Sequence, residues 1–126
     1  MGRVKIDTTT KERALDAKYA ALDSPAGVKR LLRDYHALVE RAFDGDYDAV
    51  VLLVDLATAV ELAGLTERQR ECLRLVYGED LTQEDAAWRL GISRQAVQIY
   101  IENAARKIAQ IYEYWAWRGE GYSFKN

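Results

Sequence analysis

The chain has 126 residues, of which 49% are hydrophobic and 30% charged, and its formal net charge is −2. This length and composition fit one soluble domain with a buried core, or a small domain with a helical extension. They exclude a membrane span, because Asp55 and Glu61 interrupt the longest apolar run before it reaches the roughly 18 residues required.

Two further features of the sequence bear on its cellular location. The first residues contain no apolar segment, so we expect no secretory signal. Cys72 is the single cysteine, which excludes a disulfide framework within the chain and fits the reducing cytoplasm. We therefore expect a cytoplasmic protein without membrane contact.

Helical periodicity is evident from the start of the chain. The apolar residues of segment 11–22 share one face, which predicts a short amphipathic helix. Ser24 is a favourable N-cap and Pro25 a favourable first helical residue. The apolar spacing that follows predicts a helix to about Phe43, ended by an Asp-Gly turn.

A third helix is predicted over residues 47–63, capped by Asp46 or Asp48 and ended at Gly64. Its first six apolar residues are β-branched enough to resemble a buried strand. The apolar segment is too long for a typical strand, however, and a single strand would leave its backbone groups unmatched. We therefore expect a central helix that is buried on most of its circumference.

Two shorter helices are predicted next. Thr66 and Gln69 have the spacing of a capping box, and the helix that they begin should run to Tyr77. Thr82 is expected to cap a second helix that ends at Leu90.

This second helix and the one after it match a helix-turn-helix. Ser93 caps the later helix, in which no breaker occurs until Gly119, so one long terminal helix is expected. Ala87 faces that helix where a larger side chain would push the pair apart, and Gly91 occupies the position that needs a left-handed backbone. The small core between the two helices is expected to contain Ala86, Leu90, Ile92, Val97 and Tyr100. The predicted fold class is all-α, a multi-helix bundle with a C-terminal helix-turn-helix and a long terminal helix.

Residues 65–109 resemble region 4 of bacterial sigma factors and the small phage regulators built around the same module. The stretches LTERQRECLRLVYGEDLTQEDAA, RLGISR and AARKI carry the similarity. The resemblance implies a sigma-like DNA-binding module in a small regulator encoded by a phage or prophage. Residues 1–64 match no other sigma region and are expected to be a helical region for support or oligomerisation. Residues 110–126 are expected to form a helix extension with an aromatic tail.

The residues expected to read DNA lie at the N-terminal end of the long helix, which enters the major groove in such a motif. The side chains expected to contact bases are Ser93, Arg94, Gln95, Gln98 and Ile99, with Glu102 as a further candidate. Arginine pairs with guanine or clamps a phosphate, glutamine pairs with adenine, and isoleucine contacts the thymine methyl group.

Thr82, Gln83 and Arg89 are expected to touch the phosphate backbone from the preceding helix. Sigma factors carry charged residues where this chain has Gln95, Ala96, Gln98 and Ile99, so a sigma-type promoter element is not assumed. The net charge of −2 predicts modest non-specific affinity for DNA.

The long helix also carries an apolar seam with spacings of four and three residues. Its members are Val97, Ile101, Ala104, Ile108, Ile111 and Trp115. The seam either packs on the N-terminal helices or forms a homodimer that places two recognition helices one turn of DNA apart, and both are compatible with the sequence. Trp88 is expected at an outward position of its helix. It either contacts a protein partner or packs under residues 110–126, and packing is the favoured interpretation.

No candidate for catalysis or for a metal site emerges. His36 has no second ligand near it in sequence, and Cys72 lies on an inward helix face. Asp44, Asp46 and Asp48 lack the remaining spacing of a calcium loop and are assigned to a turn and a cap. We expect no cofactor and no enzymatic activity, because no phosphate loop, nucleophile elbow or zinc signature is present.

The sequence therefore favours a sequence-specific regulator of transcription that binds double-stranded DNA, with a dimer as the favoured oligomer. One alternative is an interaction protein that uses the sigma-like module to bind RNA polymerase. The other is the small DNA-recognition subunit of a phage packaging terminase, against which the C-terminal place of the motif argues.

Overall fold

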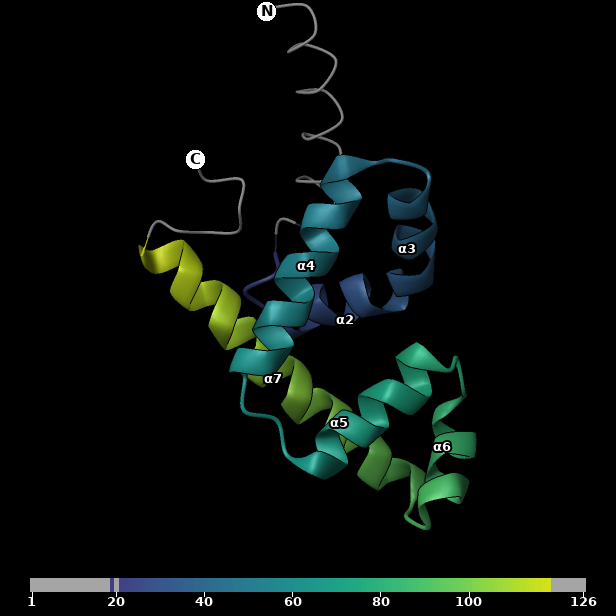
Figure 1. The fold of residues 1–126 in the computed structure, drawn as a ribbon. Coiled ribbons are helices and arrows are strands. Elements are labelled where there is room, and N and C mark those ends of the chain that lie inside the picture. The colour runs from purple at the N-terminus through teal and green to yellow at the C-terminus, as the bar shows by residue number, and fades with distance from the viewer. Residues whose placement is uncertain (1–18, 20, 119–126) are drawn as a thin grey trace, which may run out of the picture.

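The computed structural model describes Tyr19 and residues 21–118, and every regular element within them is a helix (Figure 1). The elements in chain order are α2 (Pro25–Arg33), α3 (Tyr35–Phe43), α4 (Tyr47–Leu62), α5 (Glu67–Leu73), the π-helical segment η1 (Arg74–Gly78), α6 (Gln83–Leu90) and α7 (Arg94–Arg118). The predicted all-α fold with a long terminal helix is confirmed. The amphipathic helix predicted over 11–22 lies largely outside the described residues.

The predicted helix starts are confirmed by their caps. The Ser24 hydroxyl accepts the Gly27 N–H at 3.2 Å. Asp46, rather than Asp48, caps α4, because its carboxylate accepts two N–H groups of the first turn. The Thr66 capping box of α5 is complete, with Thr66 and Gln69 each accepting the backbone N–H of the other. Each cap satisfies a donor that has no partner inside its helix.

The helix expected from Pro25 to Phe43 is in fact two helices, separated at Asp34. The backbone of Asp34 leaves helical geometry there, with φ −92° and ψ 8°, and its carboxylate accepts the Tyr19 hydroxyl at 2.7 Å. The break turns the chain so that α2 packs on α7 while α3 packs on α4. The packing of α2 and α3 on different helices thus divides a segment whose apolar spacing alone predicts one continuous helix.

The expectation that α4 is buried on most of its circumference is wrong. One face is covered by α7 and an adjacent side by α3, and this face contains the buried Ala49, Leu52, Leu56 and Ala59. The opposite face is open, so that Val54 is 56% exposed and Leu62 59% exposed. Among the described helices, α3 and α7 are the ones that pack extensively on this largely apolar helix.

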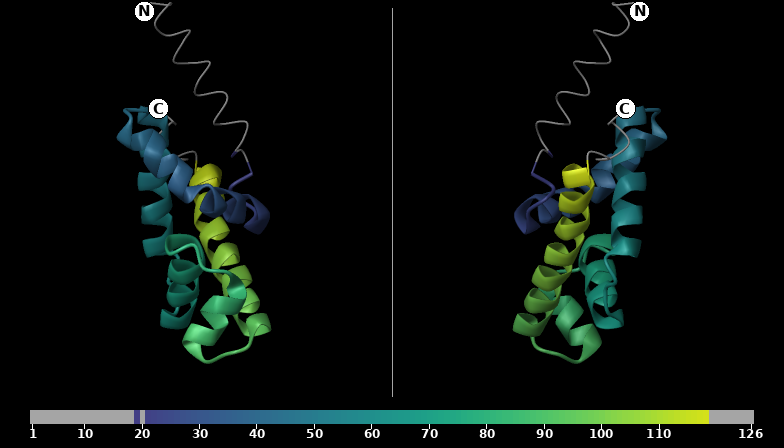
Figure 2. Two further views of the ribbon diagram at one scale, coloured as in Figure 1. Left: turned by 90° about the vertical axis from the view of Figure 1, so that its right-hand side faces the viewer. Right: turned by 90° about the vertical axis from the view of Figure 1, so that its left-hand side faces the viewer.

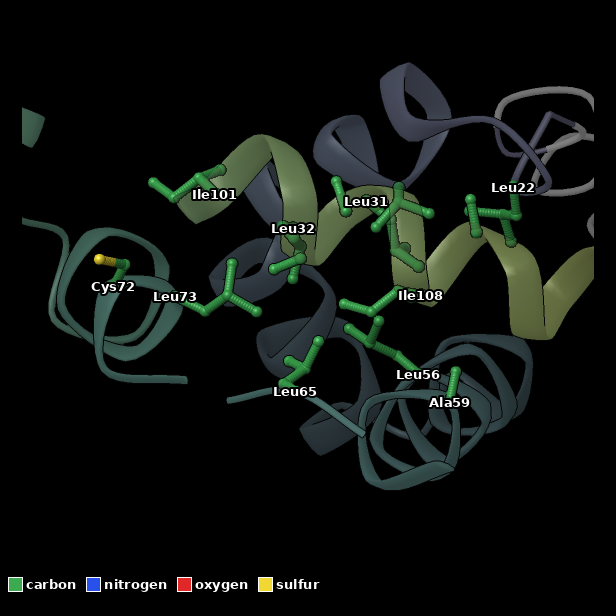
Figure 3. Close-up of a cluster of buried hydrophobic side chains, with 14 of the residues drawn as sticks. Leu22, Leu31, Leu32, Leu56, Ala59, Leu65, Cys72, Leu73, Ile101 and Ile108 are labelled. Atoms are coloured by element: carbon green, nitrogen blue, oxygen red, sulfur yellow. The ribbon is translucent and has the colours of Figure 1, made fainter. Parts of the chain in front are cut away.

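Helix α7 is the element on which the core is built, since α2, α4, α5 and α6 all pack against it. Leu31 of α2, Leu56 of α4 and Ile108 of α7 converge in this core (Figure 3). Burying one such side chain contributes about 1.5–3 kcal/mol. The two views of Figure 2 place α6 and the first turns of α7 at one end of the molecule and α3 toward the other. Among the described residues, no helix is long and apolar enough to cross a membrane.

Candidate nucleic-acid interface

Helices α6 and α7 form the predicted helix-turn-helix. The Thr82 hydroxyl begins α6 by accepting the Asp85 N–H at 3.0 Å, and Gly91 ends it in the left-handed conformation, with φ 71°. The Ser93 hydroxyl then begins α7 by accepting the Ala96 N–H at 3.0 Å. The short turn is therefore defined by two caps and one glycine.

Small residues allow the two helices to approach, as the sequence predicts. Ala86 and Ala87 of α6 are buried, as is Val97 of α7. The remaining members of the predicted small core are partly buried and pack on the same cluster: Leu90, Ile92 and Tyr100. The Ile92 N–H donates to the Ala87 carbonyl oxygen at 3.0 Å and closes the turn.

The side chains expected to read bases lie together on the exposed surface at the beginning of α7. Ser93, Arg94, Gln95, Gln98 and Ile99 are all exposed, Ile99 by 59%. They project away from the buried side of α7, which carries Val97, because helical residues repeat every 3.6 positions. Ser93 uses its oxygen for the cap but retains its O–H to donate to a ligand.

The backbone-contact candidates are more constrained. The Thr82 oxygen is occupied by its cap, and Gln83 is half-buried. Arg89 Nη1 lies 3.7 Å from Glu79 Oε1, and the second oxygen of the same carboxylate pairs with Arg74 at 2.5 Å. Arg89 therefore already has an anionic partner within the module.

Two interactions between distant segments hold α7 in place, and neither is evident from the sequence. Lys29 Nζ of α2 donates to Glu102 Oε1 at 2.7 Å, across 73 residues of chain. This hydrogen bond, opposed by some desolvation, lowers the pKa of the Glu102 carboxyl. Lys107 Nζ donates to Gln69 Oε1 at 3.1 Å and joins α7 to the cap of α5. Glu102, a further base-reading candidate, is thus engaged by α2.

The apolar seam of α7 packs within the chain. Val97, Ile101, Ala104 and Ile108 are fully or almost fully buried against neighbouring helices, and Ile111 and Trp115 are partly buried at its end. Two interpretations of this pattern are compatible with the sequence, packing within the chain and a homodimer. The observed burial of the seam corresponds to packing within the chain.

Trp88 is 85% exposed on α6. The part of α7 from residue 110 to Arg118 leaves it uncovered, and the tail beyond Arg118 lies outside the described residues. The favoured interpretation, packing under residues 110–126, is therefore not supported by the described segment. Trp88 is the most exposed tryptophan within that part of the chain.

The remaining candidate residues, Cys72 and His36, make contacts inside the fold. Cys72 is fully buried, and this burial raises the pKa of its thiol. His36 Nε2 lies 3.1 Å from the Gly78 carbonyl oxygen and links α3 to η1. No group of three or more His, Cys, Asp or Glu side chains within the described residues is arranged to hold a metal ion.

Comparison with known proteins agrees with this geometry. Residues 62–110 match the family model described as Sigma-70, region 4. A UPF0251 protein of Methanosarcina acetivorans is 48% identical over 50 residues, 40% of this chain and 45% of that protein. A UPF0251 protein of Pyrococcus horikoshii is 47% identical over 47 residues, 37% of this chain and 43% of that protein.

The matched segment spans less than half the length of these relatives. No solved structure matches the chain with comparable significance. The family match and the α6–α7 geometry coincide in one segment of the chain. Residues 62–110 are therefore a helix-turn-helix module of the sigma-70 region 4 type.

Proposed function

We propose that this protein is a sequence-specific regulator of transcription that binds double-stranded DNA and reads the major groove with the first turns of α7. The observation that carries the proposal is the exposed cluster Ser93, Arg94, Gln95, Gln98 and Ile99 directly after the capped turn at Gly91. The match of residues 62–110 to sigma-70 region 4 supports the same conclusion, since that module is a DNA-binding helix-turn-helix.

Each side chain of the cluster has a distinct role in the proposal. Arg94 places its guanidinium on guanine O6 and N7 or on a phosphate, and Gln95 and Gln98 pair with adenine. Ile99 packs on a thymine methyl group, and Ser93 donates its hydroxyl proton. Direct base contacts of this kind specify the sequence, whereas phosphate contacts position the protein.

The proposed phosphate contacts come from α6 and its amino end. Thr82 and Gln83 lie where the exposed N–H groups of the first turn favour an anion, and Arg89 follows nearly two turns later. Arg89 exchanges Glu79 for a phosphate when DNA binds. With a net charge of −2, the protein binds non-specific DNA only modestly, so that base contacts supply much of its selectivity.

The wider proposal is a cytoplasmic regulator encoded by a phage or prophage, without cofactor or catalysis. The resemblance to small phage regulators supports the origin, and the genes that flank the coding sequence test it. A homodimer would place two recognition helices one turn of DNA apart. Because the seam from Val97 to Ile108 is buried within the chain, such a dimer needs another surface.

RNA polymerase binding is a second candidate function, and the exposure of Trp88 favours it. A tryptophan that is 85% exposed on the outward side of a sigma-like module is a plausible anchor for a protein partner. Co-purification with polymerase that survives Gln98→Ala but is lost in Trp88→Ala would support this candidate. Loss of co-purification in both variants would instead indicate that DNA mediates the association.

Selection of bound sequences from random duplexes at moderate salt tests the main proposal. Gln98→Ala should weaken binding to the selected duplex by about 1–3 kcal/mol and relax the preference at one base pair. Gln110→Ala is the matched control, because it removes the same side chain from an exposed position about 18 Å further along α7. If no sequence is enriched, or if the two variants behave alike, the proposal is wrong. A mass measurement on the same sample determines the oligomer.

A further inference from the structure

Helix α2 lies beside the proposed recognition helix and carries a net positive charge of its own. Its sequence PAGVKRLLR contains three basic residues and no acidic residue. Val28, Leu31 and Leu32 are buried where α2 packs on α7, and Lys29 and Arg33, four positions apart, flank that contact. The family match begins only at residue 62, so α2 lies outside the sigma-like module.

Lys29 marks where this edge of α2 meets α7. Its ammonium group contacts Glu102, which lies one helical turn after Gln98 and one turn before Arg106. Gln98, Glu102 and Arg106 follow one another at four-residue spacing and therefore form a line along α7. The basic edge of α2 thus flanks the continuation of the proposed base-reading surface.

Arg33 belongs to the same neighbourhood. Tyr77 of η1 is half-buried, and burial raises the pKa of its hydroxyl, while the charges of Lys29 and Arg33 lower it and that of Glu102 raises it. The charges of Lys29, Arg33 and Glu102 therefore all act on this one side chain. Arg33 and Arg106 form no ion pair with any residue that the structure describes, and Arg106 donates only to the neutral Asn103 at 2.7 Å.

We infer that Lys29, Arg33 and Arg106 form a flanking basic strip that contacts the phosphate backbone beside the groove entered by α7. This inference rests on the proposed function. The strip carries three positive charges against the single carboxylate of Glu102, whereas the whole chain is acidic. A recognition helix enters the groove by its N-terminal end, so its later turns pass the phosphates that border the groove.

Glu102 has a defined part in this arrangement. A free carboxylate on this line of α7 would repel the phosphates, and Lys29 neutralises it with both side chains still partly exposed, by 30% and 41%. Lys29 keeps two further N–H donors for a phosphate beside the one given to Glu102, and removing the carboxylate would also remove its repulsion of the phosphates. The effects of Glu102 and Arg33 substitutions on DNA binding should consequently have opposite signs.

The test is the salt dependence of binding to a duplex recovered by the random-sequence selection. Each phosphate contact contributes about 0.9 to the slope of log K against log salt concentration. Arg33→Gln should reduce the slope by about one unit on every duplex, and Glu102→Gln should increase affinity at low salt. Arg30→Gln is the matched control, because the Arg30 charge acts on Tyr19 and not on Tyr77.

The outcomes separate the two proposals. If the unaltered protein binds the duplex and Arg33→Gln retains its slope, the flanking strip is refuted while DNA reading stands. Equal slope losses in Arg30→Gln and Arg33→Gln would also refute it, since they would reflect total charge. If the unaltered protein binds no duplex, both proposals fail. Opposite changes in Arg33→Gln and Glu102→Gln would support the strip, because loss of folding lowers binding in both variants.

Discussion

Glu79 is predicted to weaken DNA binding, because its carboxylate pairs with Arg89, which is proposed to contact the phosphate backbone. Its carboxylate pairs with Arg89 at 3.7 Å and with Arg74 at 2.5 Å. The two arginine side chains are 53% and 61% exposed, so solvent screens both pairs. Exposed pairs of this kind are worth about 0.2–1 kcal/mol each. Arg89 must give up its pair before it can bind a phosphate, and Glu79→Gln removes that cost.

We expect Glu79→Gln to tighten DNA binding by about 1.4- to 5-fold, which is the same free energy expressed as a ratio of affinities. In an Arg89→Gln background the substitution should have little effect, because the side chain that it frees is absent. The measurement is a fluorescence anisotropy titration against one labelled duplex. It compares the unaltered protein, the two single variants and the double variant, which together form a double-mutant cycle. Unchanged or weaker binding by Glu79→Gln, or an equal gain without Arg89, would refute the placement of Arg89 at the backbone.

Two further predictions concern stability. Gly27→Ala should lower the urea midpoint more than Gly91→Ala, because a Cβ at position 27 would lie 1.9 Å from the Ala21 carbonyl oxygen. At Gly91 it would meet nothing within 4 Å, and only the left-handed backbone is penalised, by about 1–2 kcal/mol; the reverse order would contradict this reasoning. Because Lys29 holds the pKa of Glu102 below its usual value of 4.5, the pair stabilises the fold above that pH, and this contribution is lost as the pH falls through the lowered pKa. The melting temperatures of the protein and of Glu102→Gln should differ at neutral pH and converge in acid, whereas a constant difference would argue against the pair.

The sequence alone determined the features that depend on neighbours within a few residues. The caps at Ser24, Thr66 and Thr82 each join a side chain to an N–H three positions later, so their spacing can be recognised in the sequence. The left-handed turn at Gly91 is equally local, because few other residues adopt that backbone conformation. These signals predict the helix-turn-helix, and the proposed reading surface follows the capped turn at the beginning of α7.

Only the tertiary structure decided which surfaces meet. An apolar seam has the same spacing whether its partner is a helix of the same chain or of another, and the structure shows Ile101 and Ile108 buried within this chain. The break at Asp34, the open face of α4 and the exposure of Trp88 likewise depend on which helices cross, and packing between distant segments outweighs local helical preference. The contact of Lys29 with Glu102 arises in the same way. It exists because α2 packs on α7, and this packing also brings the basic edge of α2 beside α7.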